Sequence, residues 1–194
     1  GKQKGWEVFL SDKGSLKPHY RETLNKEGIQ WEEGTHTEEK ILSADVIMKS
    51  PGIPDKAPII KKAHEKGIAV ISEIEFASQY TDSLIVGITG SNGKTTTTLL
   101  TYHIFKEAGL QVGLGGNIGY SFAELVATEN PPYYVLEISS FQLDGIEHFA
   151  PHIAVLLNIT PDHLDRYDYK FENYINSKFR IAMNQTENDY LIYD

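Results

Sequence analysis

Residues 84–96 read LIVGITGSNGKTT, an apolar run that leads into a glycine-rich loop and the sequence Gly-Lys-Thr. A continuous apolar run is typical of a strand buried on both faces of a parallel sheet. Glycine lets the backbone approach an anion closely, while Lys94 supplies a point charge and Thr95 a hydroxyl for Mg²⁺. A helix expected from Thr95 to Ala108 would turn its positive end to the same anion. The residues predicted to bind ATP are Gly90, Ser91, Asn92, Gly93, Lys94, Thr95 and Thr96.

The glycine spacing departs from the general Walker pattern, which has four residues between its glycines. Gly90 and Gly93 enclose two residues, and Gly87 and Gly93 enclose five. The alternative interpretation is a glycine-rich turn in front of a helix. The preceding strand and the amphipathic helix that follows favour a phosphate loop. The apolar stripe expected on that helix consists of Leu99, Leu100, Ile104 and Phe105.

Apolar runs alternate with helical stretches along the whole chain. Strands are expected at 6–10, 29–31, 46–48, 68–71, 84–88, 133–136 and 153–157, and helices at 19–27, 58–66 and 95–108. This alternation predicts the α/β class, with parallel sheets that carry helices on both faces in three layers. A polar stretch at 79–83 predicts a boundary between two domains, 1–80 and 81–194.

Composition excludes several kinds of site. The 194 residues include no cysteine, which rules out disulfides, thiolate metal sites and cysteine nucleophiles and indicates a cytoplasmic protein. The formal net charge of −9 argues against a nucleic-acid surface. No apolar run approaches the roughly 20 residues that span a bilayer, so no membrane partner is expected.

Polar residues recur where the predicted strands end: Ser11, Asp12, Ser50, Thr89, Glu137 and Asn158. Ligands of open parallel sheets bind outside the carboxyl ends of the strands. Glu137 is therefore a candidate to hold Mg²⁺ beside a nucleotide, and the alternative is a glutamate that faces water. Residues 160–166 read TPDHLDR and combine acids, a histidine and an arginine; a helix start with acidic residues is the alternative there.

Two patterns are interpreted as structural. Residues 113–119 read GLGGNIG, but the third glycine of a dinucleotide fingerprint would fall on Ile118, and no clear strand precedes the run. It is expected to be a loop or turn. His148 and His152 are four residues apart, but Pro151 between them disfavours a single helical face, so the pair is interpreted as structural.

Four segments together resemble the Mur ligases: 90–96, GNIG at 116–119, EISSFQL at 137–143 and NITPDHLDR at 158–166. The run from Ser139 to Leu143 resembles the D-glutamate-adding branch, and the short glycine spacing is the normal form in this family. The resemblance covers nearly all of the chain and is strongest from 84 to 180. It implies a truncated Rossmann-like domain at 1–80, without its first strand and glycine loop, and a truncated P-loop ATPase-like central domain at 81–194.

What the resemblance implies is an ATP-driven amide ligation in peptidoglycan precursor synthesis. The carboxylate of UDP-N-acetylmuramoyl-L-alanine would attack ATP, and D-glutamate would attack the resulting acyl phosphate. Lys94 would hold the β- and γ-phosphates, and Thr95 with Glu137 the first Mg²⁺. His163 would help to bind a second Mg²⁺. Lys178 would be carbamylated by CO₂ and so become an anion that binds metal.

The resemblance also implies a substrate site. Asn117, Ser139 and Gln142 would line the substrate groove, and Ser11, Asp12 and Gly52 would hold the uridine nucleotide. A C-terminal domain for D-glutamate is expected beyond this chain, so the chain is interpreted as a monomeric fragment that is inactive alone. Two alternatives stay open: another Mur or folylpolyglutamate-type ligase, and a non-catalytic nucleotide-binding fragment.

Overall fold

A computed structural model describes residues 1–194 and divides them into two compact units. The first consists of Gly1–Ile47 and Lys56–Ala69, and the second of Met48–Asp55 and Val70–Asp194. The domain boundary near residue 80, which the polar stretch indicates, stays a prediction.

The first unit is built from short strands and helices. Its elements are a 3₁₀ turn at Lys2–Lys4, β1 (Phe9–Asp12), α1 (Pro18–Lys26), β2 (Gln30–Glu33), α2 (Glu38–Ile41) and α3 (Pro58–Glu65). The strands β3 (Val46–Met48) and β4 (Ala69–Ile71) lie where the chain passes from one unit to the other. β1 and β2 pair in parallel, and β3 and β4 form another two-stranded sheet. Pro18 and Pro58 begin their helices because proline fixes φ near the helical value and needs no N–H partner there.

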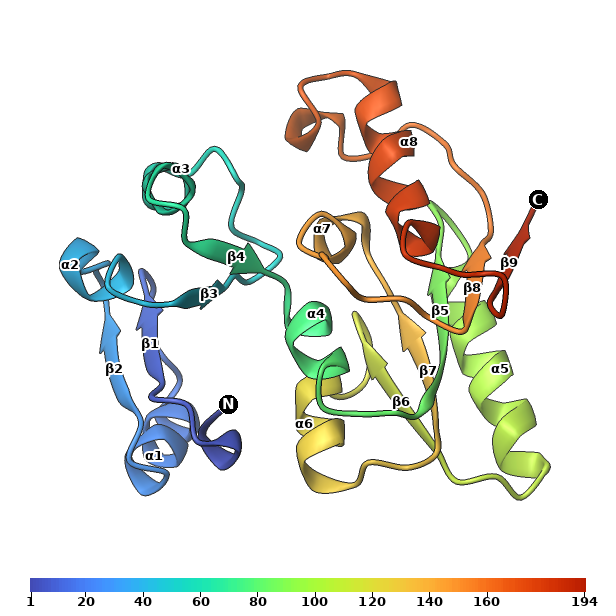
Figure 1. The fold of residues 1–194 in the computed structure, drawn as a ribbon, viewed down its shortest axis with the longest axis horizontal. Coiled ribbons are helices and arrows are strands. Elements are labelled where there is room, and N and C mark those ends of the chain that lie inside the picture. Colours follow the sequence, from blue (N-terminus) through green and yellow to red (C-terminus); the bar gives the residue numbers. More distant parts are fainter. The chain divides into compact units, whose positions relative to one another are not determined.

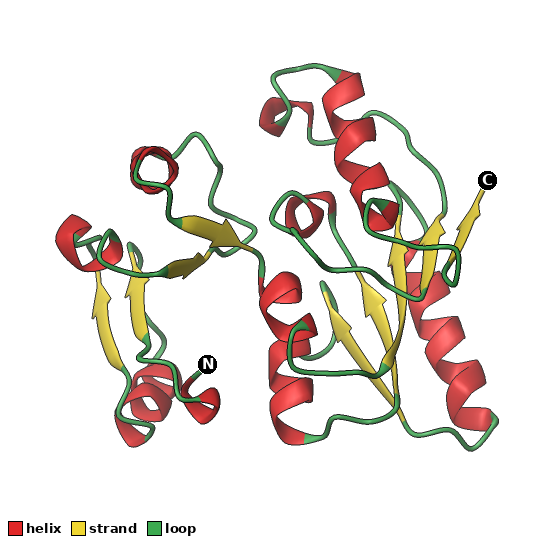
Figure 2. Cartoon of the chain, in the orientation of Figure 1, coloured by secondary structure: helices red, strands yellow, loops and turns green.

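The second unit contains a five-stranded parallel sheet. Its elements are α4 (Glu73–Ser78), β5 (Leu84–Thr89), α5 (Lys94–Glu107), β6 (Val112–Gly116), α6 (Phe122–Thr128), β7 (Tyr133–Glu137), α7 (Ser140–Leu143), β8 (Ile153–Leu156), a 3₁₀ turn at Leu164–Arg166, α8 (Phe171–Phe179), a 3₁₀ turn at Arg180–Ala182 and β9 (Tyr190–Tyr193). The strand order is β6-β7-β5-β8-β9, with every pair parallel. Helix α5 lies along one face, and α4 and α6 lie on the other (Figure 1). The alternation of strands and helices confirms the predicted α/β class (Figure 2).

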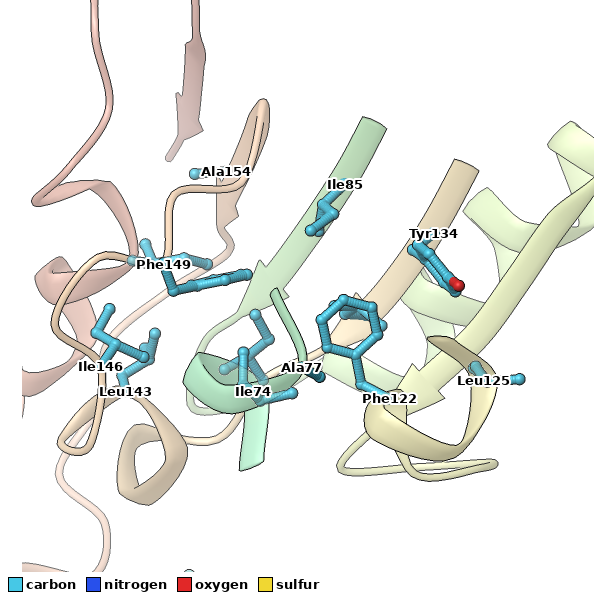
Figure 3. Packing of buried hydrophobic residues seen from close by; sticks show 13 residues of the cluster. Ile74, Ala77, Ile85, Phe122, Leu125, Tyr134, Leu143, Ile146, Phe149 and Ala154 are labelled. Atoms are coloured by element: carbon cyan, nitrogen blue, oxygen red, sulfur yellow. The ribbon is translucent and has the colours of Figure 1, made fainter. Parts of the chain in front are cut away.

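Both faces of this sheet are buried, as the continuous apolar runs predict. Ile85 and Tyr134 point to the α4–α6 side, where the Phe122 ring meets the Tyr134 ring edge-on at 5.0 Å (Figure 3). Leu136 belongs to the same buried cluster. Val86 and Val135 point to the α5 side. Alternate residues of each strand thus enter opposite layers, and each buried side chain stabilises the fold by roughly 1.5–3 kcal/mol.

The prediction of which residues form the apolar face of α5 is wrong. Leu99, Leu100 and Ile104 are 46%, 56% and 57% exposed. The face that meets the sheet carries Thr98, Tyr102 and Phe105, which follow one another at helical spacing. The prediction combined apolar residues from two sides of the helix, and only Phe105 belongs to the packed side.

The expected loop at 113–119 is also wrong in part, because β6 occupies Val112–Gly116 and pairs with β7. A Cβ at residue 113 would lie 2.8 Å from the Tyr134 ring, and one at residue 115 would lie 2.7 Å from Tyr120 O. Glycine is therefore required by close packing in this strand. No helix of the chain is both long and apolar enough to cross a bilayer.

Candidate active site

The glycine loop joins β5 to α5 at the carboxyl end of the sheet. Gly93 has φ 81° and directly precedes the first residue of α5, Lys94. A Cβ at residue 90 would lie 3.1 Å from the Leu157 side chain, so glycine allows the loop to pass close to the end of β8. The first N–H groups of α5 have no partner within the helix and face the loop, as anion binding requires.

Lys94 lies over this loop. Its Nζ donates to Gly90 O over 2.9 Å and to Ser91 O over 3.0 Å. The ammonium group is therefore held beside the N-terminus of α5, where the helix dipole already favours an anion. The contact of Lys94 with the β- and γ-phosphates stays a prediction.

The loop is fastened to the segment after β8 by several hydrogen bonds. The Ser91 hydroxyl donates to Thr160 O and accepts from Thr160 N–H, each over 2.9 Å. Asn92 N–H donates to Asn158 Oδ1 over 2.9 Å, and Asn158 Nδ2 donates back to Asn92 O over 3.0 Å. Ser91 also lies 3.1 Å from the hydroxyl of Tyr174, a buried residue of α8. These bonds fix the loop shape, a role of Asn158 and Tyr174 that sequence reasoning missed.

Glu137 is buried at the end of β7 and meets two other predicted site residues. Its Oε2 accepts from the Thr95 hydroxyl and its Oε1 from Asn117 Nδ2, each over 2.7 Å. Asn117 N–H also donates to Glu137 O over 2.8 Å. Asn117, predicted to line the substrate groove, thus orients the carboxylate in this structure.

The donor set fits a hard divalent cation in part. A hydroxyl and a carboxylate side by side, as in Thr95 and Glu137, are the oxygen ligands that Mg²⁺ accepts next to nucleotide phosphates. His163 belongs to no group of three or more His, Cys, Asp or Glu residues placed to hold a metal. Substrate oxygens and water normally supply the remaining Mg²⁺ ligands.

Lys178 of α8 is buried, with 2% of its surface exposed, and the carboxylates that act on its charge are those of Asp162 and Asp144. Its Nζ lies 3.5 Å from the Thr89 hydroxyl and 4.9 Å from the centre of the Tyr174 ring. Burial, and secondarily the charge of Lys94, lowers the pKa of Lys178 to about 8. A buried amine that loses its proton this readily is a nucleophile near neutral pH.

His163 lies on the segment after β8 with φ 50°, a left-handed conformation that is rare outside glycine. Its Nε2 lies 3.5 Å from Asp162 Oδ2, and its ring centre lies 5.2 Å from that of Phe141. Asp168 and Tyr169 on the same segment also have positive φ. Such backbone strain concentrates at functional sites.

Ser139 and Gln142 form the capping box of α7. Ser139 Oγ accepts from Gln142 N–H, and Gln142 Oε1 accepts from the N–H and hydroxyl of Ser139. In the first unit, the Ser11 hydroxyl lies 2.7 Å from both Glu32 Oε1 and His36 Nδ1, and Asp12 Oδ1 accepts from Gly14 N–H. The substrate contacts of these residues stay predictions.

The parallel sheet, the glycine loop at the start of α5 and the Thr95–Glu137 pair define an α/β protein of the P-loop nucleotide-binding class. Comparison with known families is more specific. The Mur ligase middle domain matches residues 88–194, and the MurD N-terminal domain matches residues 2–59. The chain belongs to the Mur ligase family.

Curated relatives carry the name of one member of this family. A protein of Christiangramia forsetii named UDP-N-acetylmuramoylalanine–D-glutamate ligase is 65% identical over 193 residues, which are 100% of this chain and 43% of that protein. A protein of Bacteroides fragilis with the same name is 60% identical over 192 residues, 99% of this chain and 43% of that protein. The chain therefore spans less than half the length of these relatives.

A solved structure agrees on the fold. The UDP-N-acetylmuramate:L-alanyl-γ-D-glutamyl-meso-diaminopimelate ligase of Neisseria meningitidis superposes with a TM-score of 0.63 at 20% identity. The match covers 100% of this chain and 65% of that one. At this identity the likeness establishes the fold alone.

Proposed function

We propose that this chain is the ATP-activating part of a full-length ligase that adds D-glutamate to UDP-N-acetylmuramoyl-L-alanine in peptidoglycan precursor synthesis. The observation that carries the proposal is the convergence of Lys94, Thr95 and Glu137 at the end of one parallel sheet, with the buried amine of Lys178 beneath it. The shared name of the relatives supports the choice of substrates.

The reaction must bring two anions together. A carboxylate oxygen of the UDP-linked acid attacks the γ-phosphorus of ATP, and the bond to ADP breaks. The amine of D-glutamate then attacks the carbonyl carbon of the acyl phosphate, an amide forms, and phosphate and a proton leave. Lys94 and the N–H groups at the start of α5 lower the repulsion in the first step, because they place fixed positive charge beside the triphosphate.

Thr95 and Glu137 would hold the first Mg²⁺, which supplies further screening of the transferred phosphoryl group when bound. Asn117 keeps the Glu137 carboxylate oriented, since it donates to the oxygen that Thr95 does not use. His163 would contribute to a second Mg²⁺ site. Gly90, Ser91, Asn92, Gly93 and Thr96 complete the proposed ATP-binding set.

Lys178 is proposed to be carbamylated. Its neutral amine attacks CO₂, a nitrogen–carbon bond forms, and one proton is released, which leaves an anionic carbamate. The lowered pKa of Lys178 supports this, because burial and the charge of Lys94 favour the neutral amine that reacts more than Asp162 and Asp144 oppose it. The carbamate would replace a cation that repels Mg²⁺ with an anion that binds it.

Ser11, Asp12, Gly52, Asn117, Ser139 and Gln142 are proposed to contact the UDP-linked substrate, and the protein to act as a cytoplasmic monomer. Another Mur or folylpolyglutamate-type ligase is the competing enzyme. The run Ser139–Leu143 and the names of the relatives favour D-glutamate.

An amino-acid panel tests the proposal. Full-length enzyme carrying this sequence is supplied with ATP, Mg²⁺ and UDP-N-acetylmuramoyl-L-alanine, and phosphate release is measured with D-glutamate, L-glutamate, L-alanine or meso-diaminopimelate. Release is expected with D-glutamate only, and Lys94→Ala is expected to abolish it. Release that depends on a different amino acid would replace the assignment. Release that needs no Lys94 would remove the glycine loop from the mechanism.

A further inference from the structure

Residues 50–54, here called the anchored loop, read SPGIP and lie within the second unit. Arg166 donates from Nη2 to Pro51 O over 3.2 Å and from Nη1 to Gly52 O over 3.4 Å. Lys49 donates from Nζ to Ile53 O over 2.9 Å. Three consecutive carbonyl groups of the loop are therefore held by two cationic side chains.

Lys49 is a buried cation that the proposed chemistry does not use. Its side chain is 7% exposed, and its partner Asp55, at 2.6 Å, is 62% exposed. Burial of a lysine is costly unless its hydrogen bonds are made, and here one of those bonds goes to the anchored loop. Lys49 and Asp55 thus fix the end of the loop that follows Gly52.

Arg166 connects the anchored loop to the segment that carries His163. Its guanidinium lies 4.4 Å from the centre of the Phe141 ring. That ring lies 5.2 Å from the His163 ring and 6.0 Å from the Tyr167 ring. A planar guanidinium can stack on an aromatic ring and donate to two carbonyl groups at once, whereas an ammonium group cannot.

The fixed carbonyls also fix the N–H groups of the loop. In a trans peptide the N–H points opposite to the C=O, so the Gly52 N–H points away from the carbonyl that Arg166 holds. The Ile53 N–H is used by Ser50 O. Gly52 is exposed, and a Cβ there would meet no atom within 4 Å. The Gly52 N–H makes no hydrogen bond within the chain, so it is available to donate to an oxyanion of a ligand.

We propose that Arg166 is a positioning residue that couples the anchored loop to the His163 segment, so that the Gly52 N–H is presented to an oxyanion of the substrate. The inference rests on the proposed function for the identity of that substrate. Arg166 acts through the loop backbone and does not touch the reacting atoms. Its guanidinium orients the donor, and the substrate oxyanion is either the nucleotide diphosphate or the carboxylate that reacts.

Steady-state kinetics of full-length enzyme test the coupling. Arg166→Met is expected to raise the KM for UDP-N-acetylmuramoyl-L-alanine about tenfold, equivalent to about 1.4 kcal/mol, and to leave the KM for ATP within about twofold. Arg166→Lys keeps the positive charge but loses the planar guanidinium that donates to two carbonyl groups at once, so a smaller rise in the substrate KM is expected. Lys49→Met is expected to act in the same direction, whereas Asp55→Asn leaves the bond to Ile53 O intact and should change little.

Arg180 provides a matched control, because it also donates to two carbonyl groups, Leu143 O over 2.7 Å and Ile146 O over 2.6 Å, away from the anchored loop. Arg180→Met should lower the thermal midpoint without raising the substrate KM. If Arg166→Met behaves in this way too, Arg166 is only structural and the proposal is overturned.

Two direct measurements separate the remaining outcomes. Amide hydrogen exchange should be faster in residues 50–54 of Arg166→Met than in the unmodified enzyme, and unchanged exchange would contradict the coupling whatever the reaction is. Titration with UDP distinguishes the oxyanions: weaker UDP binding in the variant identifies the diphosphate, and a loss seen only with the complete substrate identifies the carboxylate. An inactive unmodified enzyme would overturn the proposed function, and the exchange measurement would still decide on Arg166.

Discussion

The hydroxyl of Thr95 donates to Glu137 Oε2 over 2.7 Å, which joins the first turn of α5 to the end of β7. The two residues are 42 positions apart in the sequence and meet because β5 and β7 are neighbours in the parallel sheet. Asn117 Nδ2 holds the other carboxylate oxygen from the end of β6. Three adjacent strands thus set the position of one buried carboxylate.

Glu137→Gln should show whether the full-length enzyme needs the negative charge of Glu137 or only the size of its side chain. Glutamine keeps the volume and one acceptor oxygen, so the free energy of unfolding should change by no more than about 1–2 kcal/mol. The negative charge that would hold Mg²⁺ is lost, and phosphate release should fall by at least about 100-fold. Thermal unfolding and phosphate release measure the two effects. A variant with full activity would exclude Glu137 as a metal ligand.

Lys178 should make the stability of the chain depend on pH. Its pKa is lowered to about 8 in the folded chain, so the folded state binds fewer protons than the unfolded state between that pKa and the usual lysine value. The free energy of unfolding should therefore rise with pH, by about 2 kcal/mol between pH 7 and pH 9.5 from this group.

The measurement is urea unfolding in CO₂-free buffer, with Lys178→Met as the comparison. The variant should lack this rise, because it has no group to deprotonate. Equal pH dependence in both proteins would mean that Lys178 titrates normally. Lys170, which is exposed, serves as the control position, and Lys170→Met should retain the rise.

Glu75→Gln should destabilise the second unit. The buried Glu75 carboxylate of α4 accepts from the backbone N–H groups of Glu147, His148 and Phe149 over 2.8–3.1 Å. The glutamine amide has only one acceptor oxygen, and its NH₂ group would face backbone N–H groups that now donate to the second carboxylate oxygen. The free energy of unfolding should therefore fall by about 2–4 kcal/mol. The exposed Glu147 is the matched site, and Glu147→Gln should cost less than about 0.5 kcal/mol. Similar urea midpoints for both variants would contradict this account.

Gly116→Ala and Gly109→Ala should differ although both glycines have positive φ, 96° and 76°. A Cβ at residue 116 would clash with Glu137 O, whereas one at residue 109 meets nothing within 4 Å. Gly109→Ala should cost about 1 kcal/mol for its backbone alone. Gly116→Ala should cost at least about 2 kcal/mol more. Chemical unfolding of the two variants gives the comparison, and equal losses would show that residue 116 has more room than the structure gives it.

Much of the fold could be predicted from the sequence because the sheet is buried on both faces. Continuous apolar runs identify β5, β7 and β8. β6 could not be predicted in the same way, since its glycines are explained only by the ring of Tyr134 and the carbonyl of Tyr120 that lie against them. The packed face of α5 includes Thr98 and Tyr102, which a pattern of apolar residues alone does not identify.

The site residues that could be predicted are those that come directly after the carboxyl end of a strand. Thr95 and Glu137 could be paired from the topology of parallel strands. Nothing local marks Lys178 as buried, because its environment comes from Thr89 and Tyr174, and only the family resemblance indicated it. The contact of Arg166 with Pro51 spans 115 positions and depends on tertiary packing, so no sequence pattern indicates it.

Oxygen-isotope transfer tests the central claim most directly, namely that this site activates a carboxylate with ATP. UDP-N-acetylmuramoyl-L-alanine labelled with ¹⁸O in both carboxylate oxygens is supplied to full-length enzyme with ATP and D-glutamate, and the released phosphate is analysed by mass spectrometry. The acyl phosphate route predicts one ¹⁸O atom in each phosphate, because the attacking oxygen leaves with phosphorus. Product formation with unlabelled phosphate would contradict the account.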